Sequence, residues 1–335
     1  MVTALTQFLI SAAVIVVAGT FLTRYADAIA SITGLGRLVI GSLLLAGATS
    51  LPELTVDVAA VRMGLPDLAV GDLLGSSLMN LLILALLDLS HHSRGKMLSR
   101  QAAAHALAGS VSVGLTALVA LGLLTGKVLA PYAVFGISPV IFVLVVAYTL
   151  GVRLIYVDQR IAIQAAAGPG QPRVQESGET TLGKAMFGFA LCAGVILIAG
   201  PYLAASAGDL AKLSGLGETF VGTTLVAVST SLPELVSMIA ALRIGAIDLA
   251  IGNVFGSNAF NMILLAPLDA LQPQSLFATV SSRHSITCIA AILATEVAVC
   301  GQLYQSESRR RLIEPDASLV VFIVIGALAL IYYLP

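Results

Sequence analysis

The amino-acid sequence predicts an all-α polytopic membrane protein with ten transmembrane helices, arranged as two inverted five-helix repeats with broken helices at the repeat motifs. Three observations support this prediction. Hydrophobic residues make up 58% of the 335 residues and charged residues only 10%, whereas soluble domains carry about 25% charged residues. Apolar stretches repeatedly reach the ~20 residues that a helix needs to cross a bilayer. A motif containing a proline and a glutamate occurs twice, with 181 positions separating Glu53 from Glu234.

The expected spans divide evenly between two halves of the chain. The N-terminal half, residues 1–155, holds spans at 7–23, 35–61, 67–88, 99–124 and 131–154. The C-terminal half, residues 183–335, holds spans at 183–206, 217–243, 247–268, 284–303 and 317–334. A polar linker, residues 156–182, joins the halves, and the duplicated segments cover 41–88 and 222–269.

The odd number of spans in each half determines the expected orientation of the repeats. Corresponding helices of the two halves must run in opposite directions, so the repeats should be inverted. Cytoplasmic loops of membrane proteins carry an excess of Lys and Arg. If both termini are outside, the external loops keep only Arg62, Lys127, Lys212 and Arg283 of the 17 basic residues. We therefore expect an integral protein of a bacterial inner (plasma) membrane, with both termini outside and the linker in the cytoplasm.

The duplicated motif places a carboxylate directly after a proline inside an apolar span. It reads Gly47-Ala48-Thr49-Ser50-Leu51-Pro52-Glu53-Leu54 in the first half and Val228-Ser229-Thr230-Ser231-Leu232-Pro233-Glu234-Leu235 in the second. Proline removes a backbone donor and clashes with the preceding turn, so each span should break into two half-helices. A glutamate in the first turn after the break lies near the positive end of the helix dipole. Because buried acidic residues are costly in a membrane, Glu53 and Glu234 are expected to face each other at a functional site.

A hydroxyl and an amide recur at fixed spacing after each glutamate. Ser76 and Ser257 follow the glutamates by 23 residues, and Asn80 and Asn261 follow them by 27. We expect a second helix interruption at Gly75-Ser76-Ser77, where glycine allows close approach of a partner helix. Two carboxylates with hydroxyl, amide and carbonyl oxygens form a ligand set that suits Ca²⁺, with Mg²⁺ and Mn²⁺ as alternatives.

The Leu-Pro-Glu-Leu motif, followed by Gly-Ser and then Asn in two copies, resembles the α-repeats of the cation/calcium exchanger superfamily. The chain is most similar to compact prokaryotic sodium/calcium exchangers, and the likeness covers its whole length. The resemblance implies that Glu53 and Glu234 bind Ca²⁺ together with the carbonyls of Thr49 and Thr230. It also implies flanking Na⁺ sites and further polar residues facing the centre: the Ala46 carbonyl with Ser76, the Ala227 carbonyl with Ser257, and Ser50, Ser231, Asn80 and Asn261.

Some residues depart from the pattern of that family. Asn261 stands where sodium/calcium exchangers often have Asp. Asp72 stands where the second repeat has Asn253, and Asp57 has the apolar Met238 as its counterpart. Asp57 lies one helical turn beyond the motif glutamate and on the same face. It therefore either replaces the missing charge, makes a polar packing contact or lies in a water-exposed vestibule. Asp57 and Asp72 are further candidate site residues.

The resemblance implies a secondary antiporter that exchanges Ca²⁺ for Na⁺ by alternating access around a midplane site. An H⁺/Ca²⁺ antiporter is the alternative, because with Asn at positions 80 and 261 the two glutamates must supply most of the charge. A passive cation channel is the alternative from a different class. The expected partners are the lipid bilayer, Ca²⁺ and monovalent cations, with no cofactor and no nucleic acid, and the oligomeric state is left open. Enzymatic activity is not expected, since no Ser/His, Asp/Asp or metal-type constellation accompanies the glutamates.

A few polar residues lie in or next to the predicted spans but outside the motifs. His105 and Glu296 lack repeat counterparts, and for both residues we favour burial with a hydrogen-bond partner over a proton relay. Four aspartates are duplicated at span ends and are expected to cap helices: Asp67, Asp88, Asp248 and Asp269.

Overall fold

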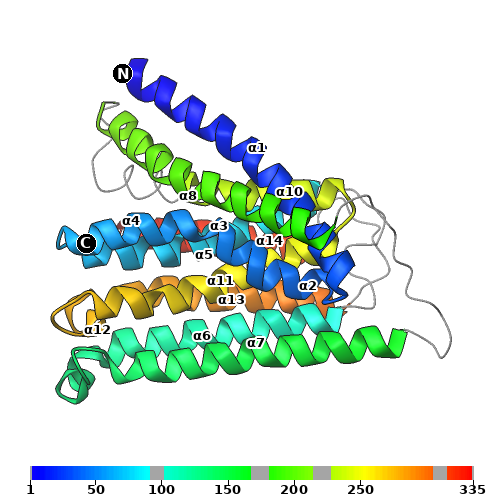
Figure 1. The fold of residues 1–335 in the computed structure, drawn as a ribbon. Coiled ribbons are helices and arrows are strands. Elements are labelled where there is room, and N and C mark those ends of the chain that lie inside the picture. The colour runs from blue at the N-terminus through cyan, green and yellow to red at the C-terminus, as the bar shows by residue number, and fades with distance from the viewer. Residues whose placement is uncertain (1, 91–101, 167–180, 214–227, 305–314, 334–335) are drawn as a thin grey trace.

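The computed structural model describes residues 2–90, 102–166, 181–213, 228–304 and 315–333, and within these ranges every regular element is a helix. The long helices lie side by side in a bundle, and the N-terminal helix projects from one end of it (Figure 1). This arrangement confirms the predicted helical membrane architecture.

The described elements fall on both sides of the central linker. The N-terminal half contains α1 (Val2–Thr33), α2 (Arg37–Ile40), the π-helix η1 (Gly41–Leu45), α3 (Ala46–Thr49), α4 (Leu51–Arg62), α5 (Pro66–Ser90), α6 (Ala102–Leu129), the 3-10 helix η2 (Ala130–Tyr132) and α7 (Pro139–Ala166). The C-terminal half contains α8 (Leu182–Leu213), α10 (Leu232–Arg243), α11 (Ile247–Ala270), α12 (Leu276–Thr279), α13 (His284–Tyr304) and α14 (Pro315–Tyr333).

Seven of the described helices are long and apolar enough to cross a membrane. Residues Arg37–Thr49 and Leu51–Arg62 together make an eighth, broken span. The apolar part of α14, Asp316–Ile331, is shorter than a full span, and the predicted span at 217–243 is described only from residue 228. The described helices therefore account for up to eight of the ten predicted spans.

α1 and α7 extend furthest beyond the predicted boundaries. α1 continues past the predicted end at residue 23 to Thr33, and α7 continues through the first part of the predicted linker to Ala166. Residues 157–166 are rich in Ala, Gln, Ile and Arg, most of which favour helix even in a polar segment. The rest of that linker, residues 167–180, lies outside the described residues.

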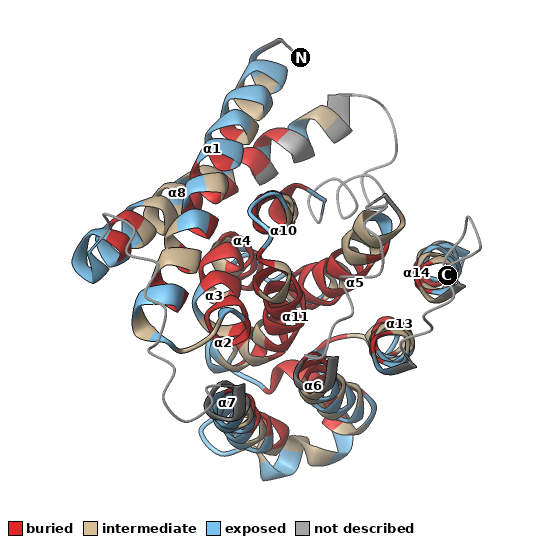
Figure 2. Ribbon diagram, turned by 90° about the vertical axis from the view of Figure 1, so that its right-hand side faces the viewer, coloured by how far each residue is buried: buried red, intermediate tan, exposed pale blue. Residues whose placement is uncertain are grey.

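α11 forms the centre of the bundle (Figure 2). Inside the protein, 83% of its most apolar window is buried, against 28% for α1 and 22% for α8. α1 and α8 lie along the outside of the bundle (Figure 2), where their apolar faces suit contact with lipid. α11 carries Ser257 and Asn261, so these two polar residues of the second repeat lie in a deeply buried helix.

The break predicted in the first repeat is present and has the expected cause. Ser50 leaves helical geometry with φ −88° and ψ 8°, and it separates α3 from α4. The two segments are bent by 42°, and Pro52 lies in the first turn of α4, where its missing donor is not needed. Ser231 and Pro233 repeat this arrangement at the start of α10.

The predicted second interruption at Gly75-Ser76-Ser77 is wrong, because α5 runs unbroken from Pro66 to Ser90. Glycine and serine keep their backbone donors, so these residues do not by themselves interrupt a helix. The close approach that glycine was expected to allow is present in the second repeat. A Cβ atom on Gly256 would lie 2.4 Å from the Cα atom of Ser42 in η1.

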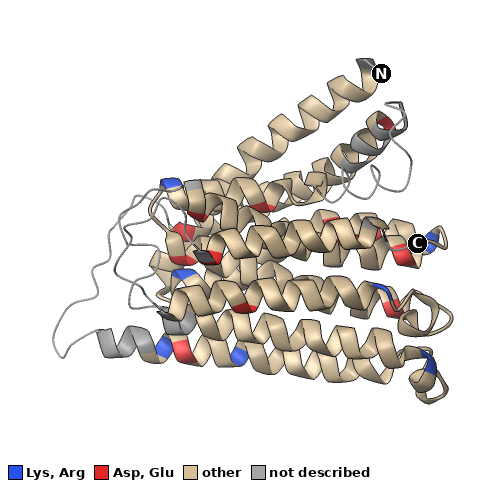
Figure 3. Cartoon of the chain, turned by 180° about the vertical axis from the view of Figure 1, so that it is seen from behind, with Lys and Arg blue, Asp and Glu red and all other residues tan. Residues whose placement is uncertain are grey.

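Charged residues are sparse along the helices and gather toward the two ends of the bundle (Figure 3). Asp67 and Asp269 lie at such ends, but they do not cap their own helices as expected. Asp67 accepts a hydrogen bond from the Ser281 backbone at 2.7 Å. Asp269 accepts hydrogen bonds from the backbone of Ser138 at 2.7 Å and of Leu276 at 2.5 Å. These aspartates therefore fasten neighbouring loops to the helix ends.

Candidate functional site

The two helix breaks bring Glu53 and Glu234 into the middle of the protein. Each glutamate lies in the first turn after its break, in α4 and α10 respectively. Both side chains are fully or almost fully buried, and they lie close enough to interact electrostatically. The N-terminal turns present free backbone donors and the positive ends of two helix dipoles to these carboxylates. The structure thus brings together the two residues that the sequence placed at the centre of the site.

The motif serines cross between the repeats. The Ser50 hydroxyl donates to Glu234 Oε1 at 3.2 Å. In the other direction the Ser231 and Ser76 hydroxyls lie 3.0 Å apart, and Ser76 donates to Glu53 Oε1 at 3.2 Å. Each motif serine therefore reaches the glutamate of the opposite repeat, directly in one case and through Ser76 in the other.

The contacts of the predicted threonine and carbonyl ligands differ between the two repeats. The Thr49 hydroxyl contacts Glu234 and lies 3.4 Å from Asn253 Oδ1. Thr230 contacts Asp72. The Ala46 carbonyl accepts bonds from the Ser50 backbone at 3.0 Å and the Thr49 hydroxyl at 3.2 Å. Ala227 lies outside the described residues.

A layer of amides packs between α5 and α11 beside the glutamates. Asn80 Nδ2 donates to Asn258 Oδ1 at 3.0 Å, and Asn258 Nδ2 donates to the Ser77 carbonyl at 3.2 Å. Asn261 Nδ2 lies 3.4 Å from both the Leu73 carbonyl and the Ser77 hydroxyl. These bonds orient the amide groups, so that the side-chain oxygens of Asn80 and Asn261 are left without a hydrogen-bond partner among the described residues.

Asp57 and Asp72 form a second acidic pair next to the glutamates. Their carboxyl groups contact each other across α4 and α5, and both side chains are buried. Asp72 also interacts electrostatically with both Glu53 and Glu234. The expectation that no Asp/Asp constellation accompanies the glutamates is therefore wrong. The i, i+4 spacing predicts from sequence that Asp57 lies on the same helix face as Glu53. The position of Asp72 beside Asp57 depends instead on the packing of α4 against α5.

Four buried carboxylates thus share one region without a basic partner. The ion pairs among the described residues join Arg37 to Asp27, His105 to Asp248 and His284 to Asp67, and none reaches this group. Burying an uncompensated charge costs several kcal/mol, so the cluster is suited to attracting cations. No three described His, Cys, Asp or Glu side chains converge closely enough to hold a metal ion alone. A bound cation would therefore also need the hydroxyl, amide and carbonyl oxygens.

Several oxygens in the site are available for this purpose. Glu53 Oε2, Glu234 Oε2 and Ser257 Oγ, like the two amide oxygens described above, are buried and have no hydrogen-bond partner among the described residues. These are hard oxygen ligands of the kind that Ca²⁺ and Na⁺ accept. The arrangement of free oxygens around buried carboxylates supports reversible binding of a desolvated cation.

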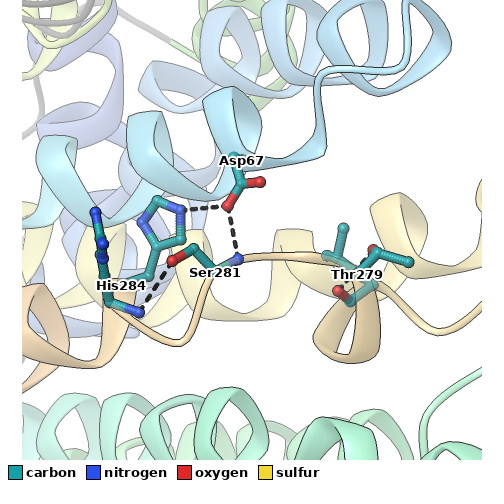
Figure 4. Close-up of polar contacts among 6 residues, drawn as sticks. Asp67, Thr279, Ser281 and His284 are labelled. Atoms are coloured by element: carbon teal, nitrogen blue, oxygen red, sulfur yellow. Dashed lines mark hydrogen bonds and ion pairs between the residues drawn. The ribbon is translucent and has the colours of Figure 1, made fainter. Parts of the chain in front are cut away.

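Two histidine–aspartate contacts lie outside the centre, and the sequence did not predict either pairing. His105 is buried as expected, and its Nε2 lies 3.0 Å from Asp248 Oδ1. The equivalent distance from His284 Nε2 to Asp67 Oδ1 is also 3.0 Å (Figure 4). The duplicated aspartates were the only sequence signal for these contacts. Glu296, in contrast, is exposed on α13, so the expectation that it is buried is wrong.

Comparisons with known proteins agree with the helical membrane architecture. The family model described as sodium/calcium exchanger protein matches residues 3–150 and 184–334. The inner membrane protein YrbG of Escherichia coli is 29% identical over 241 residues, which are 71% of this chain and 70% of that protein. The sodium/calcium exchanger MaX1 of Methanosarcina acetivorans is 39% identical over 115 residues, which are 32% of this chain and 33% of that protein. A structure of the sodium-calcium exchanger NCX_Mj, soaked with 10 mM Na⁺ and zero Ca²⁺, has a similar fold, with a TM-score of 0.69, 17% identity and coverage of 100% of this chain and 99% of that one.

Proposed function

Because the chain belongs to the sodium/calcium exchanger protein family, we propose that it is a secondary antiporter that exchanges Ca²⁺ for Na⁺ by alternating access around Glu53 and Glu234. The observation that carries this proposal is the group of four buried carboxylates with no basic partner among the described residues. Such a group is unfavourable when empty, and a cation of either kind relieves it. Competition for the same carboxylates then couples the two ions.

The proposed Ca²⁺ site uses oxygens from both repeats. Glu53 and Glu234 supply the charge, and the carbonyls of Thr49 and Thr230 complete the coordination with the nearby serines. Ca²⁺ takes about 6–8 oxygen ligands, a number that two carboxylates alone cannot provide. The contacts of Ser50 with Glu234 and of Ser76 with Glu53 support this assignment, because they hold one oxygen of each carboxylate and leave the other free.

The proposed Na⁺ sites flank this centre. One is formed by the Ala46 carbonyl with Ser76, and the other by the Ala227 carbonyl with Ser257. The buried Ser257 hydroxyl, which has no hydrogen-bond partner among the described residues, supports the second site. Asn80 and Asn261 would contribute neutral oxygens that face the centre.

Asp57 and Asp72 are proposed to supply the charge that Asn261 does not. Both lie in the first repeat, and their counterparts Met238 and Asn253 are uncharged. Three of the four acidic side chains thus come from one half. This asymmetry favours a cation position displaced from the midpoint of the two glutamates toward α4 and α5.

The proposed architecture has ten spans in two inverted halves, residues 1–155 and 183–335, joined by a cytoplasmic linker at 156–182. α5 and α11 support the inversion, since they occupy equivalent places in the two repeats and run in opposite directions in Figure 1. We expect both termini outside a bacterial inner membrane, as the distribution of Lys and Arg predicts.

Coupling to H⁺ is the second candidate function, and the contact between Asp57 and Asp72 favours it. Two carboxyl groups in contact can share a proton, and a proton bound there could exchange for Ca²⁺. The test is Ca²⁺ uptake into proteoliposomes under an outward Na⁺ gradient, under a pH gradient without Na⁺, and under no gradient.

The three conditions separate the candidate functions. The Na⁺ gradient alone should drive uptake above the level without a gradient. Uptake driven by the pH gradient in the absence of Na⁺ would favour H⁺ coupling instead. Ca²⁺ flux that does not depend on any counter-ion would indicate a passive channel, and no Ca²⁺ movement under any condition would refute the antiporter.

A further inference from the structure

Two histidine–aspartate contacts lie at helix ends outside the proposed transport site. Asp67, in the first turn of α5, accepts a bond from the Ser281 backbone at 2.7 Å and lies 3.0 Å from His284 Nε2 (Figure 4). Asp248, in the first turn of α11, lies 3.0 Å from His105 Nε2 near the start of α6. The two pairs have the same side-chain types and the same Nε2–Oδ1 distance, but of the two only the Asp67–His284 pair has the geometry of a hydrogen bond.

The contacts are reciprocal between the two halves of the chain. Asp67 and Asp248 are repeat counterparts, since 181 positions separate them as they separate Glu53 from Glu234. Each aspartate contacts a histidine from the other half, because α5 and α6 precede the linker and α11 and α13 follow it. The histidines are 179 positions apart, two fewer than the repeat offset of 181, so they are not repeat counterparts.

Each contact holds the end of a helix that supplies oxygens to the centre. Asp67 precedes Ser76 by nine residues, and Asp248 precedes Ser257 by the same number, which corresponds to about 14 Å along a helix. α5 and α11 run in opposite directions, so their first turns lie at opposite ends of the bundle (Figure 1). One contact is therefore near each membrane face.

Imidazole changes its charge at pH values between about 5 and 8, and a protonated imidazole bonds a carboxylate more strongly than a neutral one. Among the described residues, Asp67 is the acidic partner of His284, and Arg283 adjoins His284 in the chain. Asp248 is the acidic partner of His105. The strength of a histidine–aspartate contact therefore depends on the charge of the imidazole.

We propose that Asp67 with His284, and Asp248 with His105, are positioning residues that hold α5 and α11 against the opposite half and make ion exchange respond separately to pH on each membrane face. This inference rests on the proposed exchange function. Neither pair binds the transported ions. Each pair sets the position of the helix that carries a serine and an asparagine of the site.

The test measures Na⁺-driven Ca²⁺ exchange in right-side-out and inside-out membrane vesicles while pH is varied on one face at a time. The wild-type rate should change by about fivefold on each face, the effect of a single ion pair at partial exposure. Asp67→Asn and His284→Gln should each flatten the response at one face and preserve it at the other. Asp248→Asn and His105→Gln should do the reverse.

Two controls separate positioning from general damage. Glu296→Gln removes an exposed carboxylate from α13 and should leave both pH responses unchanged. The double exchange Asp67→His with His284→Asp rebuilds the contact and should restore the response that either single variant loses. Because His105 is buried, Asp248→Asn provides the test at that face if His105→Gln does not fold.

The outcomes distinguish this proposal from the function on which it rests. Wild-type pH responses at both faces in the Asp67→Asn and Asp248→Asn variants would overturn it. So would variants that flatten the response at both faces equally. Absence of Ca²⁺ exchange by the wild-type protein at every pH would instead refute the proposed antiport.

Discussion

Asp57 and Asp72 make the site asymmetric at the level of single residues. Their carboxyl groups are buried in contact, while the equivalent positions of the second repeat hold Met238 and Asn253. Two buried acidic groups in contact oppose folding unless a cation or a proton is shared between them. We therefore expect the stability of the protein to depend on cation or proton binding at this pair.

Asp57→Asn should stabilise the cation-free protein, because it removes one of two contacting buried charges while keeping the shape of the side chain. The expected gain is about 1–3 kcal/mol, seen as a higher midpoint of thermal unfolding for detergent-purified protein in a chelator. The same variant should gain less stability from added Ca²⁺ than the wild type.

Asp27→Asn is the matched control, because Asp27 is already paired with Arg37 near the surface. Its effect should stay within about 1 kcal/mol. A lower unfolding midpoint for Asp57→Asn in the chelator would mean that Asp57 is a favourable packing contact and not a source of charge.

At the level of helices, the breaks at Pro52 and Pro233 could be predicted from sequence and the continuity of α5 could not. Proline removes a backbone donor wherever it stands, yet Pro201 and Pro267 lie inside the continuous helices α8 and α11, so proline alone does not determine a break. Gly75-Ser76-Ser77 keeps its donors, so its conformation depends on packing, and α5 remains continuous. The π-helix Gly41–Leu45 lies where α11 approaches closely at Gly256.

Gly256→Ala should therefore destabilise the protein by about 1–3 kcal/mol. The added Cβ would meet the backbone of Ser42 at 2.4 Å, and a backbone atom cannot move aside as a flexible side chain can. The measurement is again the midpoint of thermal unfolding.

Gly114→Ala provides the comparison within α6, because nothing lies within 4 Å of a Cβ at that position. Alanine favours helix over glycine by up to about 1 kcal/mol, so this variant should be neutral or more stable. Equal stability of the Gly256→Ala and Gly114→Ala variants would contradict the close approach of α11 to η1.

At the level of the whole molecule, the sequence supports the helical membrane fold and the pairing of Glu53 with Glu234. Both follow from features that repeat along the chain: apolar stretches of sufficient length and a motif present in two copies. The Asp57–Asp72 contact and the two histidine contacts did not follow, because they depend on which helices become neighbours. His105 and His284 are two positions out of repeat register, so sliding the sequence on itself does not pair them.

The central claim is that Glu53 and Glu234 together bind the exchanged ions in a membrane antiporter. The most direct test is Na⁺-gradient-driven Ca²⁺ uptake by proteoliposomes containing wild-type protein, Glu53→Gln or Glu234→Gln, each shown by size-exclusion chromatography to be folded. Loss of one carboxylate from the shared site should reduce uptake by about 100-fold or more, corresponding to ~3 kcal/mol or more for a buried charged ligand. Uptake near the wild-type rate in both folded variants would contradict the claim and place the site elsewhere in the chain.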